Sequence, residues 1–211
     1  MKTRPWFGLS AAAATFALLI TPAVTQAAKS GGVATGDPAP NFTLTDSNGT
    51  EHSLSDFAGK TVVLEWTNLQ CPFVKKFYNE GHMQAMQQQY TEGGDVVWLL
   101  IASSAEGKQG YLTADGWNSA VESQGINSTA VLLDTSGEVG KLYAAKTTPH
   151  MYVIDGEGTL RYQGAIDSVR STKTGDIEGA TNYVAEALEA IAASSEVPTE
   201  TTTAYGCSVK Y

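Results

Sequence analysis

Two predominantly apolar runs, at residues 61–66 (TVVLEW) and 95–102 (DVVWLLIA), constrain the fold more than any other feature of the sequence. Runs that are rich in β-branched residues and apolar at consecutive positions are typical of strands buried on both faces of a sheet. Such a sheet needs helices on each side. Further runs of strand character occur at 130–133, 151–155 and 159–166. We therefore expect a central sheet with covered faces.

The segments around these runs have the apolar spacing of helices. They lie at 73–90, 114–124, 139–145 and 177–193, and Gly81 interrupts the first of them. Nearer the N-terminus, residues 42–44 and 51–54 alternate in polarity on either side of the turn sequence DSNG at 46–49, which predicts a small hairpin. A single helical turn should follow at 54–60. Strands that alternate with helices and end in a hairpin and a helix predict an α/β fold with a mixed central sheet.

The first 27 residues have the layout of a secretory signal peptide. A basic start with Lys2 and Arg4 precedes an apolar run at 7–24, and Thr25-Gln26-Ala27 fits a cleavage site with small residues. The alternative is an uncleaved membrane anchor, since the run is just long enough to span a bilayer. Pro22 and the small residues favour cleavage. We therefore expect a periplasmic or secreted chain with no stable membrane anchoring after cleavage.

The rest of the chain divides into three parts. Residues 28–37 are rich in Gly and Ser and predict a flexible leader, residues 38–193 predict one domain, and residues 194–211 form a C-terminal tail that carries Cys207. The length suffices for one well-packed core. The net charge of −9 at pH 7 argues against nucleic acid or anionic membrane as a partner.

The chain has only two cysteines, Cys71 and Cys207. They could form a structural disulfide, a redox couple or two unrelated thiols. Cys71 follows a predicted strand and precedes Pro72, and because Pro is favoured at the first helical position, we expect Cys71 at or beside the N-cap of a helix. A helix N-terminus favours the thiolate, which is the nucleophile in disulfide exchange and peroxide reduction. The alternative is a buried structural thiol.

Several motifs in order resemble those of the thioredoxin superfamily. The run 61–71 (TVVLEWTNLQC) resembles the strand and loop that lead to the thioredoxin active site, and the segment 42–60 resembles the opening of the redoxins, including peroxiredoxins of the alkyl hydroperoxide reductase/thiol-specific antioxidant type. Thr148-Pro149 resembles the cis-proline loop. The ending GCSVK at 206–210 resembles that of a peroxiredoxin-like subgroup. The resemblance implies a three-layer thioredoxin-like fold with an N-terminal β-hairpin.

The resemblance also implies roles for residues near Cys71. Glu65 matches the buried acid that moves protons during resolution, and burial should raise its pKa. The alternative is a carboxylate at a strand edge that pairs with Lys60 or Lys75. As the acid that moves protons, Glu65 would be a catalytic residue together with Cys71 and Cys207.

Four residues are implied in binding substrate. Thr148 and Pro149 would present backbone groups to an extended thiol substrate. Trp66 and Pro72 stand close to Cys71 in the sequence, and packing is the alternative role for Trp66. The three scattered histidines form no metal-ligand pattern, so we expect no metal and no cofactor.

The chain departs from both relatives' motifs. Val74 replaces the second cysteine of the thioredoxin Cys-x-x-Cys, and Asn68 stands three residues before Cys71, where a peroxiredoxin has Thr. The peroxiredoxin Arg is also missing from the pattern. Cys207 could act as a distant resolving cysteine. Alternatively, a Cys71–Cys207 bond is a permanent staple, worth about 4–5 kcal/mol in the chain-entropy model.

These observations support two hypotheses. In the first, the chain is a thiol-dependent oxidoreductase in which Cys71 exchanges disulfides with protein or small-molecule thiols, or reduces hydroperoxides as an antioxidant, with Cys207 as resolver. In the second, it is a non-catalytic binding module of thioredoxin fold with a structural Cys71–Cys207 disulfide.

Overall fold

The computed structural model describes residues 1–2 and 32–211. Residues 3–27 of the predicted signal peptide and residues 28–31 of the predicted leader therefore lie outside the described residues. The rest of the leader pairs with the domain: the Gly36 amide donates to the Leu160 carbonyl at 2.8 Å, and the Leu160 amide donates to Asp37 at 3.0 Å. No helix within the described residues is long and apolar enough to cross a membrane.

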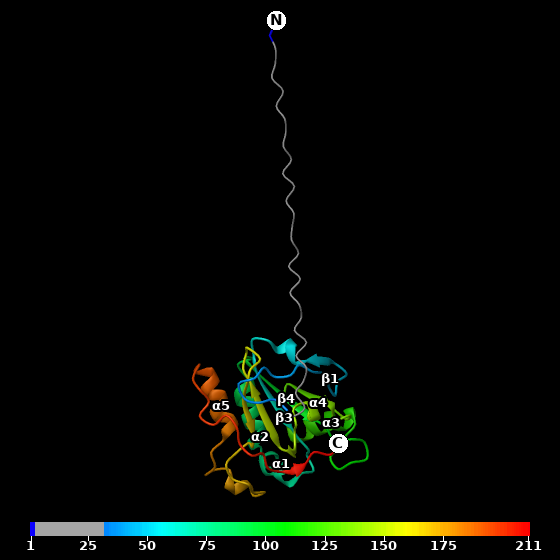
Figure 1. Ribbon diagram of the computed structural model, residues 1–211. Helices are drawn as coiled ribbons and strands as arrows, with labels where there is room; N and C mark the ends of the chain where they lie inside the picture. The colour runs from blue at the N-terminus through cyan, green and yellow to red at the C-terminus, as the bar shows by residue number, and fades with distance from the viewer. Residues whose placement is uncertain (3–31) are drawn as a thin grey trace.

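A five-stranded mixed sheet forms the centre of the fold, in the order β5-β4-β3-β7-β8 (Figure 1). The parallel strands β3, β4 and β5 pair through registers such as Leu64 with Leu99. β7 runs antiparallel to β3, and β8 antiparallel to β7. These strands are β3 (Thr61–Trp66), β4 (Val96–Ala102), β5 (Ala130–Leu133), β7 (His150–Ile154) and β8 (Leu160–Gly164).

Five α-helices surround the sheet, and the short elements lie at its margins. The helices are α1 (Pro72–Tyr78), α2 (His82–Thr91), α3 (Ala114–Gln124), α4 (Glu138–Leu142) and α5 (Tyr183–Ala192). The predicted hairpin is present as β1 (Thr43–Thr45) and β2 (Glu51–Ser53). The remaining elements are the 3-10 turns η1 (Leu54–Phe57) and η2 (Thr174–Asp176), and the two-residue strands β6 (Thr147–Thr148) and β9 (Cys207–Ser208).

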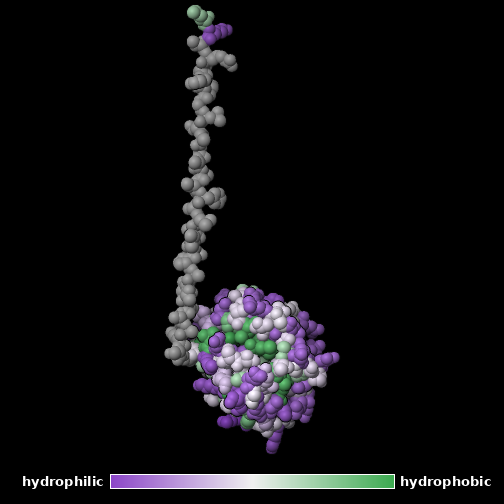
Figure 2. Space-filling model, turned by 90° about the vertical axis from the view of Figure 1, so that its right-hand side faces the viewer, coloured by the Kyte–Doolittle hydropathy of each residue, from purple (hydrophilic) through white to green (hydrophobic). Residues whose placement is uncertain are grey.

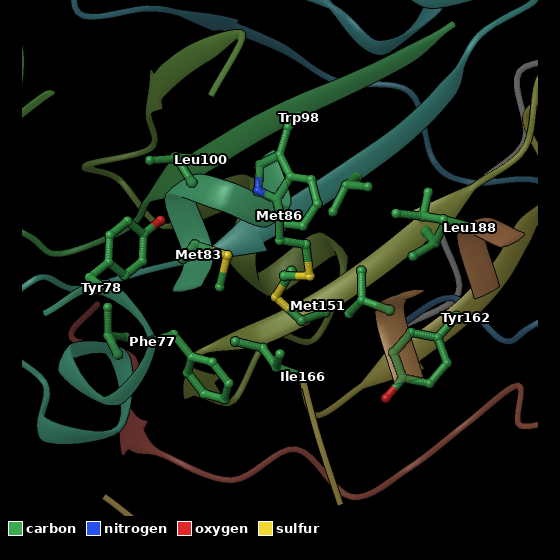
Figure 3. Packing of buried hydrophobic residues seen from close by; sticks show 14 of the residues in the cluster. Phe77, Tyr78, Met83, Met86, Trp98, Leu100, Met151, Tyr162, Ile166 and Leu188 are labelled. Atoms are coloured by element: carbon green, nitrogen blue, oxygen red, sulfur yellow. The ribbon is translucent and has the colours of Figure 1, made fainter. Parts of the chain in front are cut away.

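The sheet has a core on each face because its central strands are buried on both sides. The first core joins alternate residues of β3, β4 and β7 to residues of α1, α2 and α5, and includes Cys71 (Figure 3). The second core lies on the opposite face against α4 and the N-terminal hairpin. On the face shown in Figure 2, hydrophilic residues are interspersed with a band and smaller areas of apolar residues. The α/β class with its mixed, covered sheet is therefore confirmed.

Two predicted helices differ from the structure. The helix predicted at 73–90 is two helices, because Gly81 takes a left-handed conformation (φ 80°) and caps α2 instead of continuing α1. The helix predicted at 177–193 begins only at Tyr183. Asn182 ends the preceding loop by accepting a hydrogen bond from the Ala185 amide at 3.0 Å, which is the geometry of an N-cap.

The C-terminal tail lies against the domain along its length. It passes β8, where the Thr202 amide donates to the Gln163 carbonyl at 3.0 Å, and then crosses beside α1 (red in Figure 1). At its end, β9 pairs antiparallel with β6. The tail therefore completes one end of the domain.

Truncating Leu100 tests the first core. This side chain is fully buried at the centre of β4, so Leu100→Ala should lower the free energy of unfolding by about 2–5 kcal/mol in urea denaturation. The exposed Gln88 of α2 gives the control, because Gln88→Ala should change stability by less than about 0.5 kcal/mol. Equal effects of the two changes would contradict this view of the core.

Candidate functional site

Cys71 lies where the sequence predicts it, at the N-cap of α1. Its backbone is extended (φ −72°, ψ 126°), and the exposed Pro72 occupies the first helical position, where its fixed φ suits the helix and its missing N–H costs nothing. The Cys71 amide donates to the Asn68 carbonyl at 2.8 Å, which closes the loop after β3. The cysteine is fully buried.

A disulfide joins Cys71 to Cys207 across a sequence separation of 136 residues. The two Cα atoms are 6.0 Å apart, within the usual range for a disulfide. Unlike Cys71, Cys207 is partly exposed. The alternative of two unrelated thiols is therefore wrong. The two remaining alternatives, a redox couple and a permanent structural disulfide, differ in how easily the bond is reduced.

The Thr148-Pro149 peptide bond is cis, as the family resemblance implies, and it lies against the disulfide. The Cys71 Sγ lies 3.1 Å from the Thr148 carbonyl oxygen. Thr148 is also the strand partner of Cys207. Gly206 packs on the Thr148 carbonyl so closely that a Cβ there would collide with it. The tail thus occupies the edge at which an extended substrate was expected to pair.

Glu65 is fully buried on β3 and has polar partners on the first core's side of the sheet. Its two carboxylate oxygens accept hydrogen bonds from the Tyr78 hydroxyl and from Trp98 Nε1, each at 2.9 Å. Burial raises the pKa of Glu65 to about 7, although these two hydrogen bonds oppose part of the rise. The alternative pairing with Lys60 or Lys75 is therefore wrong. A carboxyl group with such a pKa can exchange a proton near neutral pH.

Trp66 and His150 are partners across β3 and β7, next to the cis-proline loop. Trp66 is fully buried in the second core and donates from Nε1 to the Ser103 hydroxyl at 3.0 Å, so it has a packing position without access to substrate. Burial, followed by the charge of Lys146, lowers the pKa of His150 to about 4. His150 is consequently neutral at pH 7.

Three polar residues that the sequence analysis did not connect form a buried cluster beside the disulfide. Lys76 of α1 contacts Asp167 and the hydroxyl of Tyr205, and all three side chains are buried. A weak signal exists, since Lys76 stands between the buried Val74 and Phe77 on the helix.

The predicted site residues therefore fall into two groups. Cys71, Cys207, Thr148 and Pro149 meet at one place, and Pro72 lies beside them as the first residue of α1. Glu65 lies on the same face of the sheet as the Cys71 core, while Trp66 faces the other core. The arrangement can perform thiol–disulfide exchange, because two sulfurs, one of them partly exposed, share a bond beside a backbone edge.

Comparison with known proteins gives a family match and several relatives. The profile of the AhpC/TSA family matches residues 35–163. A protein of Bacillus subtilis (strain 168), named thiol-disulfide oxidoreductase ResA, is 29% identical over 132 residues. That match covers 61% of this chain and 65% of the relative, so the chain spans less than two thirds of the relative's length.

Solved structures of two proteins have the same fold over most of the chain. An uncharacterized conserved protein from Geobacillus kaustophilus is 26% identical with a TM-score of 0.72, covering 84% of this chain and 92% of that one. A hypothetical protein from Sinorhizobium meliloti 1021 is 23% identical with a TM-score of 0.71, covering 85% of this chain and 96% of that one. These likenesses show that the fold of the described domain also occurs in these two proteins.

Replacing Glu65 tests its raised pKa through stability. The unfolded carboxyl loses its proton near pH 4.5 and the folded one near pH 7, so ionisation destabilises the folded wild type progressively as the pH rises through this window. Glu65→Gln lacks this effect. Between pH 4.5 and 8, the free energy of unfolding of wild type should fall relative to that of Glu65→Gln by on the order of 3 kcal/mol.

Urea denaturation at several pH values measures this difference. The same substitution at the exposed Glu80, just after α1, provides the matched control and should follow the wild type across the range. Parallel stability curves for wild type and Glu65→Gln would contradict a carboxyl group that titrates near pH 7.

Proposed function

Because the chain belongs to the AhpC/TSA family, we propose that it is a thiol–disulfide oxidoreductase with Cys71 as nucleophile and Cys207 as resolving cysteine. The observation that carries the proposal is the Cys71–Cys207 bond, which lies at the start of α1 and beside the cis-proline loop. The name of the Bacillus relative supports the same class of reaction. Protein or small-molecule thiols and disulfides are the proposed partners, and the chemistry needs no cofactor.

The difference in exposure suggests how electrons enter the disulfide. Cys71 is fully buried, so an incoming thiolate reaches the sulfur of the partly exposed Cys207. Attack there forms a mixed disulfide with Cys207 and releases Cys71 as a thiolate. A second thiol of the donor then attacks the mixed disulfide, which leaves both cysteines reduced and the donor oxidised by two electrons.

The reduced pair passes these electrons on in two exchanges. The Cys71 thiolate attacks a substrate disulfide, forms a mixed disulfide with one substrate sulfur and releases the other as a thiolate. The Cys207 thiolate then attacks Cys71 Sγ, re-forms the Cys71–Cys207 bond and releases the second substrate thiolate. Glu65, with its pKa near 7, is the proposed proton acceptor and donor for these steps.

Hydroperoxides are a second proposed substrate class, favoured by the family match. Peroxide would oxidise the Cys71 thiolate to a sulfenic acid with release of water or an alcohol, and Cys207 would condense with it to give the disulfide and water. Asn68, at the position of the peroxiredoxin Thr, holds the loop instead: its side chain accepts from the Gln70 amide at 2.9 Å and donates to the Gln109 carbonyl at 3.2 Å. Disulfide exchange therefore ranks first.

The proposal includes export. The layout of residues 1–27 predicts a signal peptide, and a disulfide of this kind persists in oxidising compartments such as the periplasm or the cell exterior. In this proposal, cleavage follows Ala27 and leaves the leader, the domain and the C-terminal tail in the exported chain.

Serine variants of the two cysteines test the proposed roles. In an assay of insulin disulfide reduction with glutathione as donor, Cys71→Ser should reduce the rate to the uncatalysed level. Cys207→Ser retains the nucleophile, and so it should accumulate a glutathione adduct on Cys71 that peptide mass mapping detects. Ser47→Ala, at the hairpin turn, serves as the control and should leave turnover intact.

The alternative of a binding module with a fixed disulfide gives a different result. The wild-type bond would then have a potential below about −300 mV and would resist the glutathione pool. Both serine variants would lose about 4–5 kcal/mol of stability. Neither variant would form a glutathione adduct, and the wild type would not reduce insulin. That outcome would exclude the proposed activity.

A further inference from the structure

The register of the tail decides whether Cys207 can meet Cys71, and the strand pairing alone specifies it poorly. β6 and β9 share only two residue pairs, Thr147 with Ser208 and Thr148 with Cys207. Because side chains alternate across a strand, a slip of one residue would turn Cys207 away from Cys71. Contacts outside β9 must therefore fix its position.

A polar bridge runs parallel to the disulfide between the same two segments. Lys76 lies five residues after Cys71 on α1, and Tyr205 lies two residues before Cys207 on the tail. Asp167, in the loop after β8, joins them. Its Oδ2 accepts from Lys76 Nζ at 2.6 Å, and its Oδ1 accepts from the Tyr205 hydroxyl. Breaking the disulfide leaves this second connection in place.

The bridge satisfies the hydrogen-bonding capacity of its buried groups. The ammonium group of Lys76 also donates to the Val169 carbonyl at 2.9 Å and to the Tyr205 hydroxyl oxygen at 3.3 Å, and the side chain is fully buried. An ion pair at such a position contributes little net stability compared with apolar packing, but it tolerates few alternative geometries. This arrangement is therefore best suited to fixing the position of Tyr205 and the tail that carries it.

A second anchor holds the tail on the other side of Cys207. The Val209 amide donates to the Lys146 carbonyl at 3.1 Å, and the Tyr211 hydroxyl donates to the Ala145 carbonyl at 2.8 Å. The Tyr211 ring lies over two glycines of the α4 region, at positions where a Cβ would collide with it. The two tyrosines thus bracket Cys207, and Tyr205 is the one that reaches the helix carrying Cys71.

We propose that Lys76, Asp167 and Tyr205 are positioning residues that hold Cys207 in register with Cys71 while the disulfide is reduced. The inference rests on the proposed function, since only a bond that opens and closes needs such a device. With the tail held, the Cys207 thiolate stays beside Cys71 Sγ, so resolution of a mixed disulfide is intramolecular and needs no search by the tail. The held tail also covers Cys71, so a substrate disulfide reaches Cys71 Sγ only during brief openings of the tail, which the bridge makes rare.

The variant Tyr205→Phe removes the hydroxyl and keeps the ring, which packs edge-on against Phe73 with centroids 5.7 Å apart. The equilibrium constant for closing the Cys71–Cys207 bond is measured in glutathione and dithiothreitol redox buffers of known ratio. It should fall about five- to tenfold in the variant, and a tenfold fall equals about 30 mV for this two-electron couple. In the reduced variant, iodoacetamide should also alkylate Cys71 faster than in reduced wild type.

The control is Tyr90→Phe, which removes another tyrosine hydroxyl from a carboxylate, that of Glu189, at a site between α2 and α5. It should change neither the equilibrium constant nor the alkylation rate. Equal constants and equal alkylation rates for wild type and Tyr205→Phe would overturn the positioning role, even if the enzyme turns over normally. Absence of turnover in wild type would instead overturn the proposed function, and the dithiothreitol titration still reports on the bridge in that case.

Discussion

The contact between the C-terminal tail and the Thr148–Pro149 loop is the interaction on which the site depends. It brings Cys207 to Cys71 from the far end of the chain, and it requires Gly206 because the tail lies directly on the Thr148 carbonyl. A two-residue strand pairing is too short to be stable by itself. The covalent bond, the buried polar bridge and the docking of Tyr211 together keep the tail in place.

The chemistry at this contact follows from unequal burial. The sulfur of Cys71 has no access to solvent, whereas Cys207 is partly exposed. The two cysteines belong to different segments, Cys71 to the start of α1 and Cys207 to the C-terminal tail. Loss of the tail would uncover both the buried sulfur and the backbone edge of β6. Reactivity and substrate access are therefore coupled through the same segment.

Two buried ionisable side chains lie on the first core's side of the central sheet. Glu65 lies within the first core with Tyr78 and Trp98 as partners, and Lys76 lies at its margin with Asp167. The two side chains differ in the charge of their partners. Glu65 has neutral donors only, so burial raises its pKa. Lys76 has three acceptors, one of them the carboxylate of Asp167, an arrangement suited to holding a fixed geometry.

Local sequence determined much of the fold. Three elements occur with the predicted bounds: the buried strands at 61–66 and 130–133 and the helix at 114–124. Runs of apolar residues predict the strands, Gly125 ends the helix, and the Cys71-Pro72 junction starts α1. Each of these signals acts between neighbours in the chain. The interruption at Gly81 was predicted, but its division of the segment into two helices and the late start of α5 were not, since each depends on a single backbone conformation or cap that apolar periodicity does not report.

The sequence by itself thus determined a covered mixed sheet and a cysteine at the start of a helix, because strand and helix patterns are written over a few adjacent residues. Only the tertiary structure decided that Cys207 bonds to Cys71, that Glu65 has Tyr78 and Trp98 as partners, and that Tyr205 joins Lys76 and Asp167. These contacts join residues that are from 13 to 136 positions apart. No local pattern encodes such pairs, because they form only when the packed sheet and helices bring distant segments together.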